Sequence, residues 1–206
     1  MKRDKVIIID YGMGNIRSVL NKIYRAGQEA QVSNDPDLIK GADKLILPGV
    51  GHFYNGMKKL LESNIVEILN EKVQNDKIPI LGICLGMQLF TLYSEEGGTE
   101  GLGWLDAKTV RFNLNDIRFK VPHIGWNSIE QKKESPILKG IPDNSFYYFV
   151  HSYHVKCHNF KDILATSNYG YEFVSAVQQD NIYGTQFHPE KSHEWGEKML
   201  TNFLNL

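Results

Sequence analysis

The sequence is poor in cysteine and has no long apolar run. Its 206 residues include two cysteines, too few for a disulfide framework, and a functional thiol would favour a reducing compartment. No segment approaches the roughly 20 apolar residues of a membrane-spanning helix, and the apolar run at 6–9 is too short for a secretory signal. The formal net charge of −1 gives no general reason to expect nucleic acid or an anionic membrane as a partner. We expect a cytoplasmic protein that binds neither.

Apolar strands and amphipathic helices alternate regularly in the first half of the chain. The apolar pattern predicts strands at 6–9, 29–33, 44–47 and 79–83, and helices at 15–26, 54–74 and 85–93. Short, fully apolar strands separated by helices indicate a parallel sheet that is covered on both faces.

The second half is richer in strands. After residue 98, aromatic and β-branched residues predict strands at 105–112, 120–129, 145–157, 163–167, 172–178 and 182–187, before a closing helix at 192–206. Since the sequence shows neither a linker nor an internal repeat, we predict a single α/β domain over residues 1–206. Its mostly parallel central sheet would be flanked by helices, and the second half would add antiparallel strands.

A cysteine stands at the corner between the strand at 79–83 and the helix that follows it. The corner reads Gly82-Ile-Cys84-Leu-Gly86, the form of a nucleophile elbow, in which a sharp strand-to-helix turn strains the central residue and exposes its side chain. Glycines are needed beside such a turn because side chains there would collide with the backbone. A helix that begins at Cys84 would also favour the thiolate. The alternative is a structural cysteine in a tight turn.

A base for this thiol is predicted at His188. The segment Gly184-Thr-Gln-Phe-His188-Pro-Glu190 suggests a strand that ends at the proline, which cannot donate to a sheet. Residues two apart on an extended segment share a face, so Glu190 could orient the imidazole of His188. Thiolate, imidazole and orienting carboxylate together form a catalytic triad. The alternative is an ordinary surface turn.

An oxyanion hole is predicted at the turn Pro48-Gly49-Val50-Gly51, which follows an apolar strand. The N–H groups of its last three residues could point at a developing oxyanion. The N–H of Leu85, the residue after the elbow cysteine, would be a further donor. The alternative is a plain turn.

With these three motifs in this order, the chain resembles the class I (triad) glutamine amidotransferases. Their signature is an elbow cysteine in Gly-x-Cys-x-Gly-x-Gln, a downstream His-Pro-Glu and an early Pro-Gly-x-Gly turn, and all three occur here. The resemblance implies a flavodoxin-like sheet, a triad of Cys84, His188 and Glu190, and glutamine binding by Gln88. We expect no cofactor and no metal.

Five segments resemble the glutaminase subunits of imidazole glycerol phosphate synthases. They are Asp10–Val19, Leu47–Phe53, Pro122–Asn127, Phe149–Tyr153 and Gln186–Ser192. The resemblance implies that the chain hydrolyses L-glutamine and delivers ammonia to a (β/α)₈-barrel synthase subunit, with which it forms a heterodimer. That synthase makes imidazole glycerol phosphate and an aminoimidazole carboxamide ribotide in histidine biosynthesis.

The same resemblance implies which residues face the partner subunit. They are Asn15, Arg17, His123, Trp126, Tyr153 and Lys191. Each has a simpler alternative: helix capping or a solvated face for the first two, core packing for the next two, an aromatic-rich strand for the tyrosine and a solvated turn for the lysine. One position departs from the family pattern, since His154 stands where a second tyrosine is expected.

Three other patterns carry less weight. Gly12–Arg17 follows a strand as a dinucleotide fingerprint does, but Arg17 replaces the third glycine and opposes close helix–strand packing. Glu95–Gly98 indicates only a polar loop. Four metal-ligand side chains lie close in sequence, but a regular strand would divide them between two faces and no zinc-site spacing occurs: His151, His154, Cys157 and His158.

Two rival functions remain open at this point. One is a catalytically silent regulatory or assembly subunit on the same fold, against which the intact set of triad residues argues. The other is a paralogous glutaminase that feeds a different amidotransferase, for instance in surface-polysaccharide biosynthesis, because the ammonia acceptor binds the other subunit. Measuring glutaminase activity with and without the partner distinguishes the silent subunit from an active glutaminase. A synthase assay distinguishes the paralogous glutaminase from the subunit of imidazole glycerol phosphate synthase.

Overall fold

The computed structural model describes residues 4–114 and 116–206, and its first half alternates strands and helices. The strands β1, β3 and β4 are buried along their whole length, as expected where helices cover both faces of a sheet. The elements are β1 (Val6–Ile9), α1 (Ile16–Arg25), β2 (Gln31–Ser33), α2 (Pro36–Lys40), β3 (Lys44–Gly49), α3 (Phe53–Glu62), α4 (Val66–Asn70), the π-helical turn η1 (Glu71–Asn75), β4 (Ile80–Cys84) and α5 (Leu85–Leu89).

The second half consists mainly of strands and ends in a helix. Its elements are β5 (Thr91–Ser94), β6 (Thr99–Glu100), β7 (Leu105–Arg111), β8 (His123–Ser128), β9 (Glu130–Gln131), η2 (Pro136–Leu138), β10 (Phe146–His151), β11 (Tyr153–Cys157), η3 (Phe160–Asp162), β12 (Ile163–Asn168), β13 (Glu172–Gln179), β14 (Ile182–Thr185), η4 (Pro189–Lys191) and α6 (His193–Leu204).

Two sheets organise the described residues. In the larger sheet the strand order is β2-β1-β3-β4-β14-β13-β11-β7-β5-β6; β12 also pairs with β13, and β9 pairs with β12. The strands from β2 to β14 run parallel to one another, and β13, β11 and β7 continue the sheet in antiparallel pairings. β8 and β10 form a separate antiparallel ribbon. The predicted fold class is therefore confirmed.

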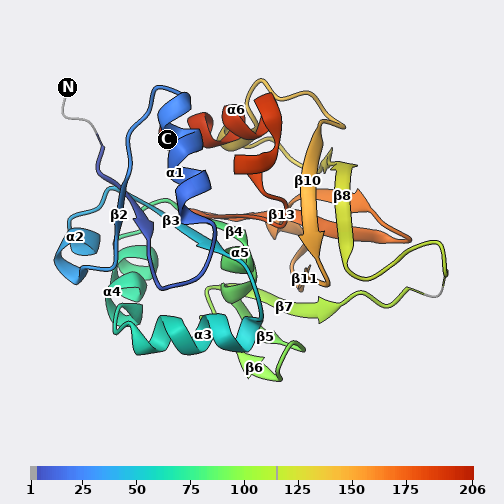
Figure 1. Cartoon of the computed structure of the whole chain (residues 1–206), viewed down its shortest axis with the longest axis horizontal. Helices are drawn as coiled ribbons and strands as arrows, with labels where there is room; N and C mark the ends of the chain where they lie inside the picture. The colour runs from blue at the N-terminus through green and yellow to red at the C-terminus, as the bar shows by residue number, and fades with distance from the viewer. Residues whose placement is uncertain (1–3, 115) are drawn as a thin grey trace.

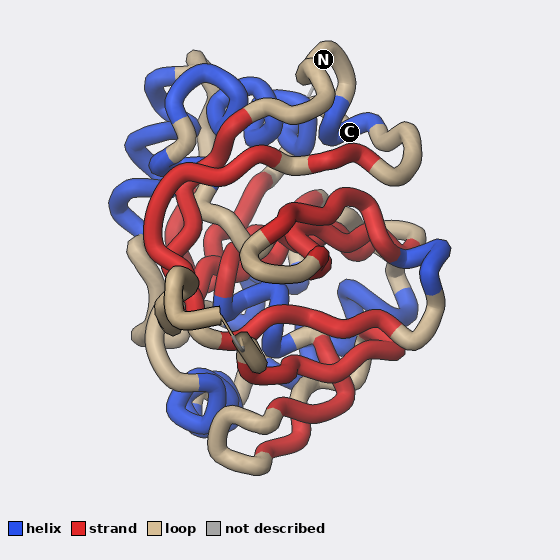
Figure 2. Tube along the Cα trace, turned by 90° about the vertical axis from the view of Figure 1, so that its right-hand side faces the viewer, coloured by secondary structure: helices blue, strands red, loops and turns tan. Residues whose placement is uncertain are grey.

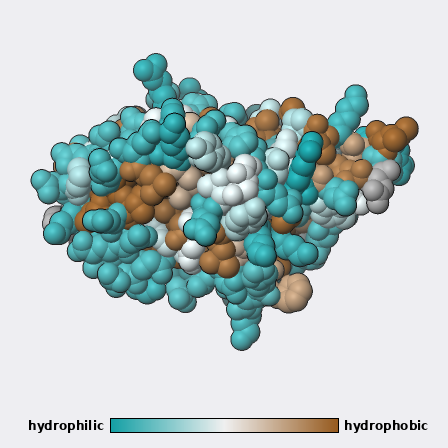
Figure 3. Space-filling model, turned by 90° about the horizontal axis from the view of Figure 1, so that it is seen from below, coloured by the Kyte–Doolittle hydropathy of each residue, from teal (hydrophilic) through white to brown (hydrophobic). Residues whose placement is uncertain are grey.

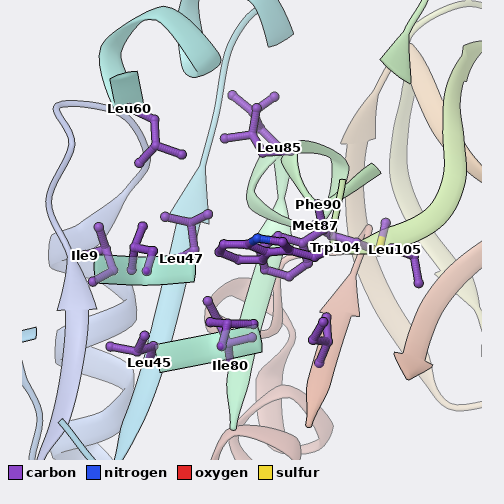
Figure 4. Packing of buried hydrophobic residues seen from close by; sticks show 14 of the residues in the cluster. Ile9, Leu45, Leu47, Leu60, Ile80, Leu85, Met87, Phe90, Trp104 and Leu105 are labelled. Carbon is purple, nitrogen blue, oxygen red and sulfur yellow. The ribbon is translucent and has the colours of Figure 1, made fainter. Parts of the chain in front are cut away.

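Helices cover both faces of the parallel part of the sheet (Figure 1). The side of the molecule that carries β8 and β10 is dominated by strands (Figure 2). One apolar cluster includes Leu60 of α3 and Leu85 of α5, which point toward Leu47 of β3 (Figure 4). A second cluster on the opposite face includes Val19 of α1 and Phe203 of α6. Seen from below, the surface is largely hydrophilic, with apolar side chains between the polar ones (Figure 3).

The prediction of one continuous helix at 54–74 is wrong. α3 ends at Glu62, and Asn64 adopts a left-handed backbone with a φ of 56° before α4 begins at Val66. Asparagine tolerates this conformation better than most residues, and a helix cannot continue through it. The apolar periodicity on both sides of the break hid it from the sequence pattern.

Two further predicted elements are also wrong. The helix predicted at 85–93 ends at Leu89, because Thr91–Ser94 pairs with β7 as the strand β5. The strand predicted at 145–157 is two strands in different sheets, since β10 pairs with β8 and β11 pairs with β7 and β13. α2 was not predicted, although Asp35 caps it by accepting a hydrogen bond from the Asp37 N–H at 2.9 Å.

Within residues 4–114 and 116–206, no helix combines the length and the apolar character that a bilayer crossing requires.

Candidate active site

The predicted nucleophile, base and oxyanion turn lie at one edge of the central sheet. β4 lies between β3 and β14, and the three strands run parallel. Cys84 ends β4 and pairs with Gly49 at the end of β3, while His188 follows shortly after the end of β14. Since the carboxyl ends of parallel strands meet at the same edge of a sheet, these residues come together although they are far apart in sequence.

Cys84 lies at a strained corner. Its φ of 54° and ψ of −110° fall outside the regions that non-glycine residues prefer, and α5 begins at the next residue. A Cβ on Gly86 would overlap the carbonyl oxygen of Leu47, and one on Gly82 would lie 2.6 Å from the backbone nitrogen of Met87. The corner therefore needs both glycines because it approaches β3 and α5 closely, as an elbow does.

The imidazole of His188 is held by Glu190. Its Nδ1 lies 2.8 Å from Oε1 of Glu190, and both side chains are almost completely buried. Burial lowers the pKa of His188, but the charge and proximity of Cys84 and the contact with Glu190 outweigh burial and raise this pKa to about 10. Nε2 of His188 has no hydrogen-bond partner among the described residues, so this nitrogen is the one open to exchange a proton.

The backbone between these two residues differs from the predicted extended segment. β14 ends at Thr185, and Glu190 lies in the single turn η4. The His188 carbonyl accepts hydrogen bonds from the Lys191 N–H at 3.0 Å and from the Ser192 hydroxyl at 2.6 Å. The turn thus brings the Glu190 carboxylate back to the His188 ring. The sequence had predicted the same contact, but from two residues on one face of an extended strand.

A pocket of about 300 Å³ opens beside Cys84. Three of the predicted oxyanion residues line it, Val50, Gly51 and Leu85, whereas Gly49 does not. The side of Gly49 that would carry a side chain instead faces Tyr11, Leu85 and Gly86. A larger cavity of about 950 Å³, lined by parts of β7, β11 and β13, contains none of the predicted site residues. Cavity size alone would therefore point away from the predicted site residues.

Gln88 lines this pocket and is itself buried. Its Nε2 donates to the Tyr153 carbonyl and to Oε1 of Gln186, each at 3.0 Å. Nε2 of Gln186 in turn donates to Sγ of Cys84 at 3.6 Å. Gln88 is thus connected to the thiol through Gln186, a residue that the sequence pattern did not single out.

Comparison with known proteins identifies the family of this chain. The family model described as glutamine amidotransferase class-I matches residues 7–206. The chain belongs to this family. The resemblance inferred from the motifs is therefore confirmed, and the chain is a member of an enzyme family.

Relatives of known name are similar over almost the whole chain. The imidazole glycerol phosphate synthase subunit HisH 2 of Methanococcus maripaludis is 53% identical, with 97% of this chain and 98% of the relative covered. The subunit HisH 2 of Pseudomonas aeruginosa is 49% identical, with 98% and 99% covered. The chain therefore also belongs to the family of HisH subunits of imidazole glycerol phosphate synthase.

Solved structures of lower identity share the fold. A structure described as glutamine amidotransferase has a TM-score of 0.76 at 18% identity, and 97% of this chain and 99% of that chain are covered. PurLQS from Thermotoga maritima has a TM-score of 0.75 at 17% identity, with 99% of each chain covered. At these identities the likeness supports the fold alone.

One predicted partner-facing residue of this amidotransferase lies in the interior. His123 is 3% exposed, and its Nδ1 lies 3.0 Å from Nε2 of His151. Nδ1 of His151 faces the Tyr153 carbonyl at 2.8 Å, so Nδ1 carries the proton and Nε2 accepts from His123. The His123 side chain is therefore buried in the chain itself, as the core-packing alternative expects, and its contact with a partner stays a prediction. The alternation of a strand could not show which side of β8 faces the core.

The other predicted partner-facing residues are at least partly accessible. Asn15, Arg17 and Lys191 are exposed, and Tyr153 is half-buried at the pocket. Trp126 is 44% exposed and stacks on His193 with 4.6 Å between ring centroids. Asn15 precedes α1 but makes no side-chain capping bond, so the capping alternative does not explain it.

The loop after β5 contributes a residue that sequence reasoning assigned only to a polar loop. Glu96 lines the pocket, and its Oε2 accepts the Phe53 N–H at 2.7 Å. This contact anchors the carboxylate beside the start of α3. No local signal distinguishes Glu96 from its neighbour Glu95, since the position depends on how β5 pairs. In the described part of the chain, no group of three or more His, Cys, Asp or Glu side chains could hold a metal ion.

Proposed function

We propose that this chain hydrolyses L-glutamine through a thioester on Cys84, with His188 as acid and base and Glu190 as the residue that orients it. The observation that carries the proposal is the buried 2.8 Å contact of Glu190 with His188, at the same sheet edge as a cysteine with a φ of 54°. Such a set of nucleophile, base and orienting group is the general form of a catalytic triad.

The first half-reaction forms the thioester. The raised pKa of His188 supports an imidazolium beside the Cys84 thiolate. The thiolate attacks the side-chain amide carbon of glutamine, and Nε2 of His188 gives its proton to the departing nitrogen, which leaves as ammonia. In the second half-reaction His188 takes a proton from water as the water attacks the thioester, and glutamate and thiolate are released.

Backbone N–H groups at the pocket stabilise the charge that develops on the amide oxygen. Val50, Gly51 and Leu85 are candidates because they line the pocket beside the thiol. The carboxylate of Glu96, at the same pocket, is suited to the α-ammonium group of the substrate. Gln88 and the Tyr153 carbonyl form part of the opposite wall.

The ammonia acceptor is bound by a partner subunit. The relatives in Methanococcus maripaludis and Pseudomonas aeruginosa are named as subunits of a synthase, and we propose that this chain forms a heterodimer with a (β/α)₈-barrel synthase subunit in the cytoplasm. Trp126, Lys191 and Arg17 are exposed residues available to that contact. The synthase would use the ammonia to make imidazole glycerol phosphate and an aminoimidazole carboxamide ribotide.

A second candidate function differs only in the acceptor. Both of these relatives are named subunit HisH 2, and numbered names distinguish several such subunits. A paralogue with the same catalytic residues can supply ammonia to another amidotransferase. A synthase assay with the co-expressed partner separates the two, since only the first function yields imidazole glycerol phosphate.

The partner also controls hydrolysis in this proposal. Glycines on both sides of Val50 allow the peptide between Gly49 and Val50 to rotate, so that either a carbonyl oxygen or an N–H faces the pocket. The wrong orientation removes one oxyanion donor, a loss of about 10²–10³-fold in rate. Docking of the synthase with its ligand shifts the population toward the orientation with the N–H in the pocket.

The test is steady-state glutamate release by the isolated chain and by its complex with the synthase subunit and the acceptor ligand. We expect the complex to be faster by at least about a hundredfold. An isolated chain that already matches the liganded complex would contradict control by the partner. A complex that releases no glutamate would contradict the proposed function and favour the silent subunit.

A further inference from the structure

Tyr11 carries a buried hydroxyl that the proposed mechanism does not use. The residue follows β1 and is 4% exposed. Its hydroxyl group has no hydrogen-bond partner among the described residues. A buried polar group without a partner costs free energy, so its presence here calls for a physical reason.

The hydroxyl lies beside the oxyanion turn. A Cβ built on Gly49 would lie 2.7 Å from the Tyr11 hydroxyl oxygen, its nearest heavy atom outside Gly49 and the two residues next to it in the chain. Val50 and Gly51 line the pocket, whereas Gly49 and Tyr11 do not. The hydroxyl therefore lies beside Gly49, at the start of the oxyanion turn, on a residue that does not line the substrate pocket.

The geometry of a peptide group links the direction of the Gly49 carbonyl to that of the Val50 N–H. The N–H and C=O of a trans peptide point in opposite directions. When the Val50 N–H turns toward the pocket, the Gly49 carbonyl turns away from it, and the nearby Tyr11 hydroxyl is then a candidate donor to that carbonyl. A phenolic hydroxyl is a stronger donor than acceptor, because its oxygen lone pair is delocalised into the ring. It therefore favours the orientation in which a carbonyl faces it.

The electrostatic surroundings keep this donor protonated. Burial, and after it the negative charge of Cys84, raise the pKa of Tyr11 well above its ordinary value. The hydroxyl therefore retains its proton throughout the pH range in which a thiolate nucleophile works. The effect of Cys84 also shows that Tyr11 lies within electrostatic reach of the thiol.

We propose that Tyr11 is a positioning residue, whose hydroxyl donates a hydrogen bond to the Gly49 carbonyl and so holds the Val50 N–H in the oxyanion pocket. The inference rests on the proposed glutaminase function and adds a residue to its control. In the resting arrangement the hydroxyl is unpaired, and in the active arrangement it gains a partner. Tyr11 thus favours the active arrangement without contacting glutamine.

The test compares Tyr11→Phe with the wild-type chain, alone and in the liganded complex. The loss of one such hydrogen bond is expected to lower glutamate release by the isolated chain about fivefold. The liganded complex loses less, because its partner already favours the active arrangement, so the stimulation factor of the variant rises. The KM for glutamine in the complex stays unchanged, and the thermal midpoint of the isolated variant does not fall, because Phe removes a hydroxyl that has no partner at rest.

Tyr147→Phe is the matched control. The Tyr147 hydroxyl is also buried and without a partner among the described residues, but it lies on β10, where the centroid of its ring is 4.1 Å from that of Phe187. We expect unchanged rates for this variant. Replacement of Tyr11 by 4-aminophenylalanine, which restores an N–H donor, is expected to recover the lost rate.

Four outcomes would overturn the inference. Equal rates for wild type and Tyr11→Phe would leave the proposed function intact and remove the role of Tyr11. A higher unstimulated rate in Tyr11→Phe would show that the hydroxyl favours the resting arrangement. An equal loss of rate in Tyr11→Phe and Tyr147→Phe would indicate a general packing effect, and so would a lower kcat accompanied by a changed KM for glutamine. A wild-type complex without glutaminase activity would overturn the inference together with the proposed function.

Discussion

Cys84 and Cys157 are both buried thiols, but their surroundings differ. Cys84 ends a strand at the pocket and lies near His188. Cys157 lies on β11, where burial and then the charge of Asp162 raise its pKa to about 12. Its thiol therefore stays protonated at neutral pH, and a thiol is a poor nucleophile.

Substitution Cys157→Ser is accordingly expected to retain most of the glutaminase activity of the liganded complex. Serine keeps the size of the side chain, and nothing in the proposed chemistry uses Cys157. The measurement is glutamate release at saturating glutamine, with circular dichroism as a check on folding. A folded but inactive Cys157→Ser protein would mean that the nucleophile has been assigned to the wrong cysteine.

Residues of the candidate site differ in how far the sequence could predict them. Cys84, His188 and Glu190 stand in short motifs whose local geometry suggests their roles, which remain proposals. Gln186 and Tyr11 could not be predicted in this way, because their significance depends on contacts across the sheet. A glutamine in a strand and a tyrosine after one carry no such information by themselves.

At the scale of elements, the ribbon of β8 and β10 is joined to the pocket by paired imidazoles. His123 on β8 donates to His151 on β10, and His151 donates to the Tyr153 carbonyl at the pocket wall. The ring of His123 stacks on Tyr169 at 4.0 Å and on Phe149 at 5.0 Å. Burial lowers the pKa of His123 to about 4, so the ring is neutral in the folded protein at neutral pH.

This burial makes stability depend on pH. The folded pKa of His123 lies below its ordinary value of 6.5, so between about pH 6.5 and pH 4 the unfolded chain binds more protons. Stability therefore falls as the pH falls through this window. His123→Phe keeps the aromatic stack and removes the titrating group, so the loss of unfolding free energy over the window should shrink by on the order of 2 kcal/mol.

Urea denaturation at several pH values measures this slope. The variant will also be less stable at pH 7, because Nε2 of His151 loses its donor, a cost of about 1–3 kcal/mol. The lost hydrogen bond lowers stability whether or not residue 123 can be protonated, whereas the missing titration changes only how stability depends on pH. The two effects can therefore be measured separately. An unchanged slope would contradict the assignment of His123 as a buried neutral imidazole.

The elements themselves were only partly predictable. Continuous apolar runs predicted β1, β3 and β4, and helical periodicity predicted α1 and α6; these elements pack into the two apolar clusters on either face of the sheet. The split of 145–157 into β10 and β11 was not predictable, since both strands are rich in aromatic and β-branched residues and differ only in their partner strands. In such a segment the pairing with other strands, and not the local strand propensity, determines where one strand ends and the next begins.

At the scale of the whole molecule, the order of the strands assembles the candidate site. β3, β4 and β14 are neighbours although residues 85–181 separate the last two in sequence. This order places the turn after β3, the corner after β4 and the segment after β14 at one edge. The sequence could indicate a parallel sheet with its functional turns at the carboxyl edge. It could not give the position of β14, which returns to the parallel core after the antiparallel strands.

The most direct test of the account is the activity of the Cys84→Ser complex with two nitrogen donors. The complex with the synthase subunit is supplied with acceptor and either glutamine or ammonium salt, and product formation is measured. The account predicts no detectable product from glutamine and a wild-type rate from ammonia, because the thiol works only in releasing ammonia. Glutamine-dependent synthesis that survives in Cys84→Ser, or the loss of both activities in a folded complex, would contradict it.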